Sequence, residues 1–228
     1  MLLELFTNTD ALHKDQNGVI SPINQFIISY PMRQKLFLKY TSIILVVIGL
    51  FLLIAPKQWF PDFYKPVFMG IVALLSPALI YLPKFILKKS NPVKRALILE
   101  MRSVIAFSLA INIAGELGLF QLYKYGFQYD KFAHFIVSML FAFILGESLK
   151  EWEHFTPKKV AWLVFLIVFS SGLLWEFFEA TSDLLFKTQE WGAYGKNITW
   201  DTLGDIAFNA LGILSGIIIS KIPKRRRR

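Results

Sequence analysis

Long apolar stretches separated by short polar segments run along most of this chain. The clearest of them, SIILVVIGLFLLIA at residues 42–55, approaches with short flanks the ~20 residues that a helix needs to cross the ~30 Å hydrocarbon core of a bilayer. The pattern predicts an all-α fold, a polytopic membrane bundle of about six transmembrane helices. Their expected positions are 36–55, 66–87, 96–120, 131–149, 160–181 and 202–222.

The remaining segments are short, and nothing in them indicates an internal repeat or a further folded domain. Residues 1–35 contain the turn signals Asn17-Gly18 and Ser21-Pro22 and are expected to form a cytoplasmic or interfacial lead-in. Residues 36–222 would form the transmembrane domain, and residues 223–228 a basic cytoplasmic tail.

Composition supports the membrane assignment and narrows the chemistry. Hydrophobic residues make up 55% of the chain and charged residues only 18%, whereas soluble domains carry about 25% charged residues. The absence of cysteine excludes disulfides and thiolate metal sites. A net charge of +9 would suggest a nucleic-acid partner in a soluble protein; in a membrane protein, basic residues instead hold the cytoplasmic ends of helices.

The distribution of lysine and arginine predicts the orientation. Basic residues concentrate in the lead-in, the second and fourth loops between spans, and the tail KRRRR. Because positive residues favour the cytoplasmic side, we expect both termini in the cytoplasm of a multi-pass plasma (inner) membrane protein.

With that orientation, polar residues of several spans meet near the outer leaflet. Residues three and four apart share one face of a helix, and each span that contributes has such a set. The sets are Asp130, Lys131 and His134; Glu176, Glu179 and Asp183; Asp201, Asp205 and Asn209; and, on the third span, Asn112 and Glu116. Ionisable groups inside a bilayer are costly, so we expect these side chains to face one another.

Carboxylates held together repel one another unless a cation is present. Lys131 is one candidate counter-charge, and a divalent metal such as Zn²⁺, Mn²⁺ or Mg²⁺ is the other. The candidate metal ligands are Asp130, His134, Glu176, Glu179, Asp201 and Asp205. The candidate catalytic residues are Glu176, Asp205 and Lys131. A metal here could activate water or polarise a phosphoryl oxygen, which suggests hydrolysis or group transfer on a lipid or lipid-linked envelope substrate.

Three motifs carry a family resemblance: D-K-x-x-H-F at 130–135, E-x-x-E at 176–179 and W-D-T-x-x-D-x-x-x-N-x-x-G at 200–212. In this order and spacing they resemble the YjdF-type membrane proteins of unknown function, DUF2238, within a broader VanZ-like group. That wider group commonly has E-x-x-Q in the second motif, where this chain has Glu179. The resemblance covers roughly residues 100–220.

Other interpretations of the same residues remain open. The carboxylates could form a cation or proton relay in a transporter or flippase-like protein, although polar groups clustered at one depth argue against a pathway. The cluster could also be a non-catalytic network that fixes helix packing. Individually, Asp201 could cap a helix, and His134 could be an interhelical hydrogen-bonding partner. The pattern G-x-x-x-G at 212–216 predicts close helix packing.

Overall fold

The computed structural model describes residues 22–60, 65–87, 92–150, 155–187 and 197–221. These residues form six long helices and two short 3-10 turns, with no strand among them. The elements are α1 (Pro22–Ile54), η1 (Lys57–Trp59), α2 (Pro66–Ile86), α3 (Pro92–Glu116), η2 (Leu119–Tyr125), α4 (Tyr129–Lys150), α5 (Pro157–Phe186) and α6 (Ile198–Lys221). The basic tail and most of the lead-in lie outside the described residues.

All six helices are long and apolar enough to span a membrane, which confirms the predicted number of spans. The helix boundaries lie within five residues of the predicted ones, apart from the start of α1. Helix α1 begins at Pro22, within the expected lead-in. Helix α3 ends at Glu116, and Gly118, with a φ of 130°, turns the chain into η2. A positive φ is readily available to glycine, which explains why the helix stops there.

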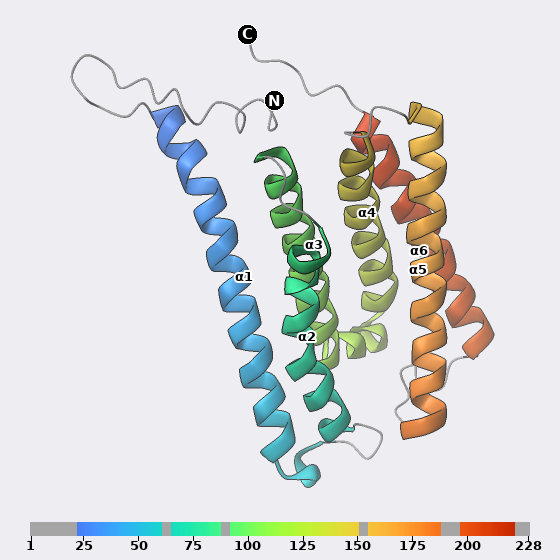
Figure 1. Cartoon of the computed structure of the whole chain (residues 1–228). Helices are drawn as coiled ribbons and strands as arrows, with labels where there is room; N and C mark the ends of the chain where they lie inside the picture. The colour runs from blue at the N-terminus through green and yellow to red at the C-terminus, as the bar shows by residue number, and fades with distance from the viewer. Residues whose placement is uncertain (1–21, 61–64, 88–91, 151–154, 188–196, 222–228) are drawn as a thin grey trace.

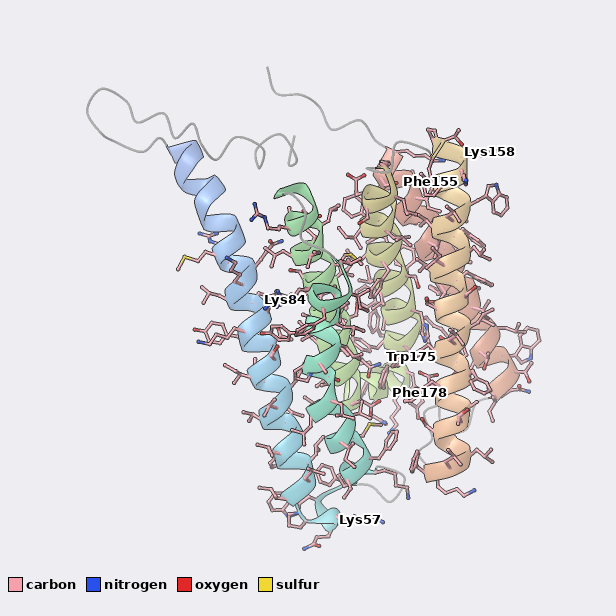
Figure 2. All side chains as sticks on the ribbon, in the orientation of Figure 1. Lys57, Lys84, Phe155, Lys158, Trp175 and Phe178 are labelled. Atoms are coloured by element: carbon pink, nitrogen blue, oxygen red, sulfur yellow. The ribbon has the colours of Figure 1, made fainter. Side chains whose placement is uncertain are left out.

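The helices form two groups (Figure 1). Helices α1, α2 and α3 share a core of Leu38, Leu45, Ile80 and Ala106. Helices α4, α5 and α6 share a second core, built around Ala142, Val164 and Ile213. Large apolar side chains project outward around the bundle, while Lys57 and Lys158 lie at opposite ends of it (Figure 2). The outward faces therefore suit contact with lipid acyl chains.

The closest approach within the second group is between α4 and α6. A Cβ atom added at Gly212 would meet the Phe135 carbonyl oxygen, and one added at Gly216 would meet the Met139 carbonyl oxygen. The two glycines therefore let α6 lie directly against the α4 backbone, as the G-x-x-x-G pattern predicted. This contact fixes the distance between the two helices that carry most of the polar residues.

A pair of polar contacts connects α3 to its neighbours. The Tyr129 hydroxyl, at the start of α4, donates a hydrogen bond of 2.9 Å to the Ile111 carbonyl oxygen. Arg102 Nε donates one of 3.2 Å to the Ile80 carbonyl oxygen, and its guanidinium lies 4.5 Å from the centre of the Tyr81 ring. The first residue of α4 is therefore tied to α3 more than one turn before that helix ends, because Ile111 precedes Glu116 by five residues.

Candidate functional site

Lys131 holds the first turn of α4 against the first turns of α6. Its Nζ forms ion pairs with Asp205 Oδ1 at 2.7 Å, Asp201 Oδ1 at 2.8 Å and Asp130 Oδ2 at 3.2 Å. It also donates to the Asp201 carbonyl oxygen at 3.0 Å. Gly204 leaves room for the lysine stem, because a Cβ atom there would lie 2.8 Å from Lys131 Cε. The sequence prediction of Lys131 as a counter-charge is consistent with this geometry.

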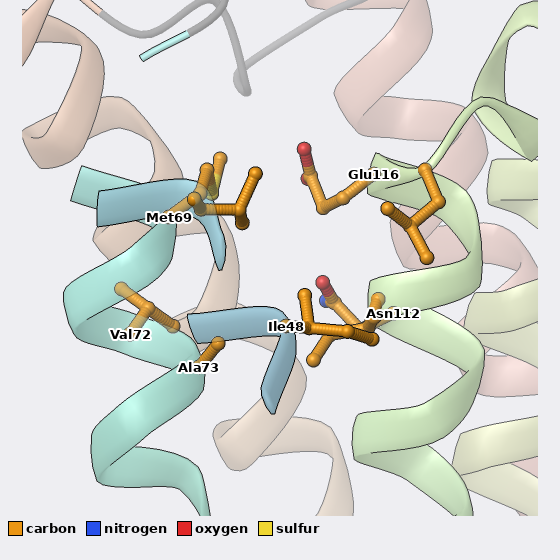
Figure 3. Close-up of a pocket in the computed structure, with 9 residues that line it drawn as sticks. Ile48, Met69, Val72, Ala73, Asn112 and Glu116 are labelled. Carbon is orange, nitrogen blue, oxygen red and sulfur yellow. The ribbon is translucent and has the colours of Figure 1, made fainter. Parts of the chain in front are cut away.

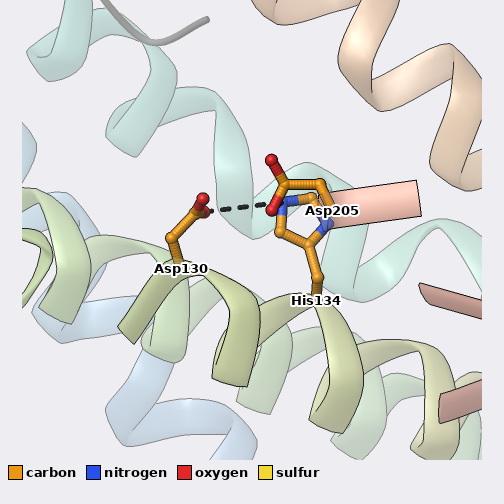
Figure 4. A group of neighbouring side chains, drawn as sticks. All are labelled: Asp130, His134 and Asp205. Carbon is orange, nitrogen blue, oxygen red and sulfur yellow. Dashed lines mark ion pairs between the residues drawn. The ribbon is translucent and has the colours of Figure 1, made fainter. Parts of the chain in front are cut away.

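The His134 imidazole lies one helical turn deeper, and its Nε2 faces carboxylates from all three helices. The Nε2 atom is 3.5 Å from Asp130 Oδ1, 3.5 Å from Asp205 Oδ1 and 3.8 Å from Glu176 Oε1. Figure 4 shows the side chains of Asp130 and Asp205 gathered at the His134 ring. Ligand atoms of Asp130, His134 and Asp205 all lie within 4.8 Å of one another, close enough to hold one metal ion.

The other ring nitrogen of His134 has a different partner. His134 Nδ1 lies 3.3 Å from Asn209 Oδ1, which also accepts a 2.6 Å hydrogen bond from the Ser138 hydroxyl. The Asn209 amide nitrogen points the other way, towards Gly172 on α5. Because Asn209 Oδ1 is an acceptor, Nδ1 carries the proton in this contact. The lone pair of a neutral ring is therefore on Nε2, among the carboxylates.

Glu176 is the residue of α5 that contacts His134. Its side chain is 8% exposed, and Oε1 is buried without a hydrogen bond. Buried polar atoms in proteins normally have partners, so such an atom calls for an explanation. Its nearest charged neighbour is His134 Nε2, on the same side as the oxygens of Asp130 and Asp205.

Three of the predicted polar residues do not join these contacts. Glu179 Oε1 instead accepts a 2.6 Å hydrogen bond from Trp175 Nε1 of its own helix. In the described part of the chain, no ion pair or hydrogen bond connects Glu179 to the other carboxylates. Asn112 and Glu116 face away from α4 altogether, into a pocket between α1, α2 and α3 (Figure 3). The expectation that all these groups face one another is therefore wrong for α3.

We call the group of interacting side chains the polar cluster. Its members are Asp130, Lys131, His134, Ser138, Glu176, Asp201, Asp205 and Asn209. Sequence reasoning missed Ser138, although a signal was present: Ser138 follows His134 by four residues and so shares its face of the helix.

The motifs that form the polar cluster lie within a long match to one protein family. Residues 35–226 match the model of DUF2238, described as a predicted membrane protein. The chain belongs to the DUF2238 family. No curated protein and no solved structure matches it.

The charges of the polar cluster do not balance among its own side chains. Four carboxylates contact one ammonium and one imidazole. If all the carboxylates are ionised, two negative charges remain even when both ring nitrogens carry protons. An uncompensated charge in a low-dielectric region is strongly unfavourable. A divalent cation would supply the missing charge, and oxygen donors with one imidazole suit Zn²⁺ or Mn²⁺.

The polar cluster is confined to one end of its helices. Deeper in the bundle, Ala142, Val164 and Ile213 are fully buried and form an apolar layer. Beyond this layer, Lys150 Nζ pairs with Glu147 Oε1 at 2.8 Å and donates to the Ser220 carbonyl oxygen. The two polar regions of the second helix group are therefore separated by packed hydrocarbon.

Proposed function

We propose that the polar cluster binds a divalent cation and that this DUF2238 protein uses it as a membrane hydrolase or transferase. The observation that carries the proposal is the environment of His134 Nε2. The other ring nitrogen, Nδ1, is hydrogen-bonded to Asn209. The Nε2 atom lies within 3.8 Å of carboxylate oxygens of Asp130, Asp205 and Glu176. A neutral ring in this position directs a lone pair at negative oxygens, which repel it. A cation placed between them turns the same arrangement into a ligand set.

The surrounding residues have distinct roles in this proposal. Asn209 orients the imidazole, as hydrogen-bonding partners of metal-bound histidines commonly do. Lys131 balances part of the charge and holds Asp201 and Asp205 in place. Glu176, with one buried oxygen that lacks a hydrogen bond, either completes the ligand set or accepts a proton from the attacking group. A bound divalent cation would supply Lewis acidity and an activated water.

The depth of the polar cluster favours a substrate from the lipid phase. Glu176 precedes the last residue of α5 by ten residues, or about 15 Å along a helix. Asp130 is the most accessible carboxylate in the ion pairs, with a side chain 36% exposed. We therefore propose a lipid or lipid-linked substrate, in keeping with the suggested VanZ-like kinship. The positive-inside rule supports a multi-pass plasma membrane location, with both termini cytoplasmic and the cluster towards the outer leaflet.

Two rival functions make different use of the same residues. A transporter or flippase-like relay needs polar groups across the membrane, and the apolar layer at Ala142, Val164 and Ile213 argues against one. A purely structural network is favoured by the four contacts of Lys131 Nζ. The structural alternative does not, however, account for the Glu176 oxygen that lacks a hydrogen bond.

Metal analysis separates the proposal from the structural alternative. We expect detergent-purified wild-type protein to retain a stoichiometric divalent metal and Glu176→Gln to lose most of it while remaining folded. The matched control is Glu116→Gln, which makes the same change in the α1–α2–α3 pocket and should keep the metal. Wild-type protein that contains no metal, binds none on titration and melts identically with and without chelator would refute the metal-dependent function.

The orientation has its own test, because the chain contains no natural cysteine. Single cysteines replacing Ser90 and Gly195 can be probed in intact cells with a thiol reagent that does not cross membranes. We expect labelling at 195 and protection at 90. The reverse pattern would place the polar cluster near the inner leaflet.

A further inference from the structure

The pocket between α1, α2 and α3 lies apart from the polar cluster and has a different chemical character. Its walls are apolar, from Ile48 and Leu52 of α1 and Met69, Val72 and Ala73 of α2. Helix α3 contributes Asn112 and Glu116, whose polar ends point into the pocket (Figure 3). The two residues are four apart and so lie side by side on one face of α3.

Neither polar side chain has a protein partner in the described residues. No ion pair or hydrogen bond there involves the Glu116 carboxylate or the Asn112 amide, whereas most carboxylates of the polar cluster are paired. A carboxylate among apolar walls without a counter-charge is costly. The pocket therefore offers negative charge and acceptor oxygens to a ligand that brings a positive charge and hydrogen-bond donors.

We propose that this pocket binds a primary ammonium group, either the headgroup of an amine-bearing phospholipid or a free alkylamine. A primary ammonium carries three N–H donors. The two oxygens of Glu116 and the carbonyl oxygen of Asn112 provide three acceptors, and the apolar walls suit the attached carbon chain. A divalent metal fits poorly, because Ca²⁺ and Mg²⁺ take about six oxygen ligands.

The volume of the pocket and its depth in the membrane narrow the choice of ligand further. The cavity volume is about 30 Å³, and a water molecule needs about 10–15 Å³ by this measure. The space suits an ammonium group, and a trimethylammonium group would bring none of the N–H donors that the three acceptor oxygens can bind. Glu116 is the last residue of α3 and of its apolar span. The carboxylate is therefore placed near the level of lipid headgroups, where phosphatidylethanolamine presents its amine.

The test compares two lipids that differ only in methylation of the headgroup nitrogen. Full-length protein is placed in nanodiscs of phosphatidylcholine, or of phosphatidylcholine mixed with phosphatidylethanolamine of the same acyl chains. We expect phosphatidylethanolamine to raise the wild-type Tm and to be retained in native mass spectra. Glu116→Gln should abolish the Tm shift and weaken retention about tenfold, because a charge-assisted hydrogen bond is lost. Asn112→Leu should reduce both the Tm shift and the retention of phosphatidylethanolamine. This variant replaces Glu116→Gln in the test if Glu116→Gln does not fold.

Further arms identify the source of the amine and exclude general lipid effects. Methylammonium chloride added to phosphatidylcholine nanodiscs should raise the wild-type Tm if a free amine suffices, and tetramethylammonium chloride should not. Glu179→Gln, the same change outside the pocket, should keep the full response. The proposal is overturned if wild type distinguishes neither the two lipids nor the two ammonium ions, or if its response survives Glu116→Gln. Metal content should be unchanged by Glu116→Gln, so this test stands independently of the proposed function.

Discussion

The two helix groups surround their polar residues in opposite ways. In the α4–α6 group, Lys131 and His134 each contact three carboxylates, and these come from more than one helix. In the α1–α3 group, Glu116 and Asn112 face apolar walls and have no partner among the described residues. In both groups, acidic residues lie four positions from another polar residue on the same helix. Both sets are at the same end of the bundle. The spacing along a helix is therefore similar, and the difference lies in what the neighbouring helices present.

The largest expected effect comes from removing the central cation of the polar cluster. Lys131→Met leaves Asp201 and Asp205 buried without their ammonium partner, and we expect a loss of about 3–5 kcal/mol in stability. Thermal melts or denaturant titrations in detergent measure this loss. Lys124→Met, an exposed lysine on η2, serves as the control and should change little. A Lys131→Met protein as stable as wild type would mean that the ion pairs of Lys131 do not hold the second group together.

The next effect tests the close approach of α4 and α6, which brings the polar cluster together. At Gly216 even one methyl group would meet the Met139 carbonyl oxygen. We expect Gly216→Ala to force the helices apart and lower stability by about 1–3 kcal/mol, as overpacking typically does. Leu214→Ala, on an exposed face of the same helix, is the comparison. Equal melting temperatures for these two variants would contradict the proposed role of the glycine contact.

A more specific effect concerns the partner of His134. Asn209→Leu removes the acceptor shared by His134 Nδ1 and Ser138, and leaving such groups unsatisfied costs about 1–3 kcal/mol. If His134 is a metal ligand, metal affinity should also fall by about 10–100-fold, because the ring loses its orienting partner. Titration with Zn²⁺ or Mn²⁺ measures the affinity. Ser138→Ala, which keeps Asn209, should retain most of it. An unchanged affinity in Asn209→Leu would show that the amide does not orient a ligand.

The smallest effect is expected at Glu116 and sharpens the contrast between the two groups. In phosphatidylcholine, Glu116→Gln should cause no loss of stability, because it breaks no protein contact and removes a charge that has no partner among the described residues. The same substitution at Glu176 should remove the bound metal and lower the Tm of the metal-loaded protein. A large loss of stability in Glu116→Gln, measured in the same lipid, would show that the α1–α3 pocket depends on a carboxylate contact within the protein.

The amino-acid sequence by itself determined the fold class and most of the site. Apolar runs of spanning length predicted six helices, because backbone groups in hydrocarbon must be satisfied within each segment. Spacings of three and four residues predicted which polar residues share a face. The alternating direction of the spans then predicted which helix ends meet. Together these features predicted that Asp130, His134, Glu176, Asp201 and Asp205 are neighbours.

Only the tertiary structure decided which faces are turned towards one another. Helix rotation depends on packing between neighbours, and the periodicity of one helix does not report it. Asn112 and Glu116 match the spacing of the polar cluster, yet α3 turns them towards α1 and α2. Glu179 shares a face with Glu176, yet its carboxylate bonds to Trp175. The close contact of α4 and α6 brings Ser138 to Asn209 and places Lys131 between three carboxylates. Two glycines of α6 make this contact possible, although the residues that meet are more than seventy positions apart in the sequence.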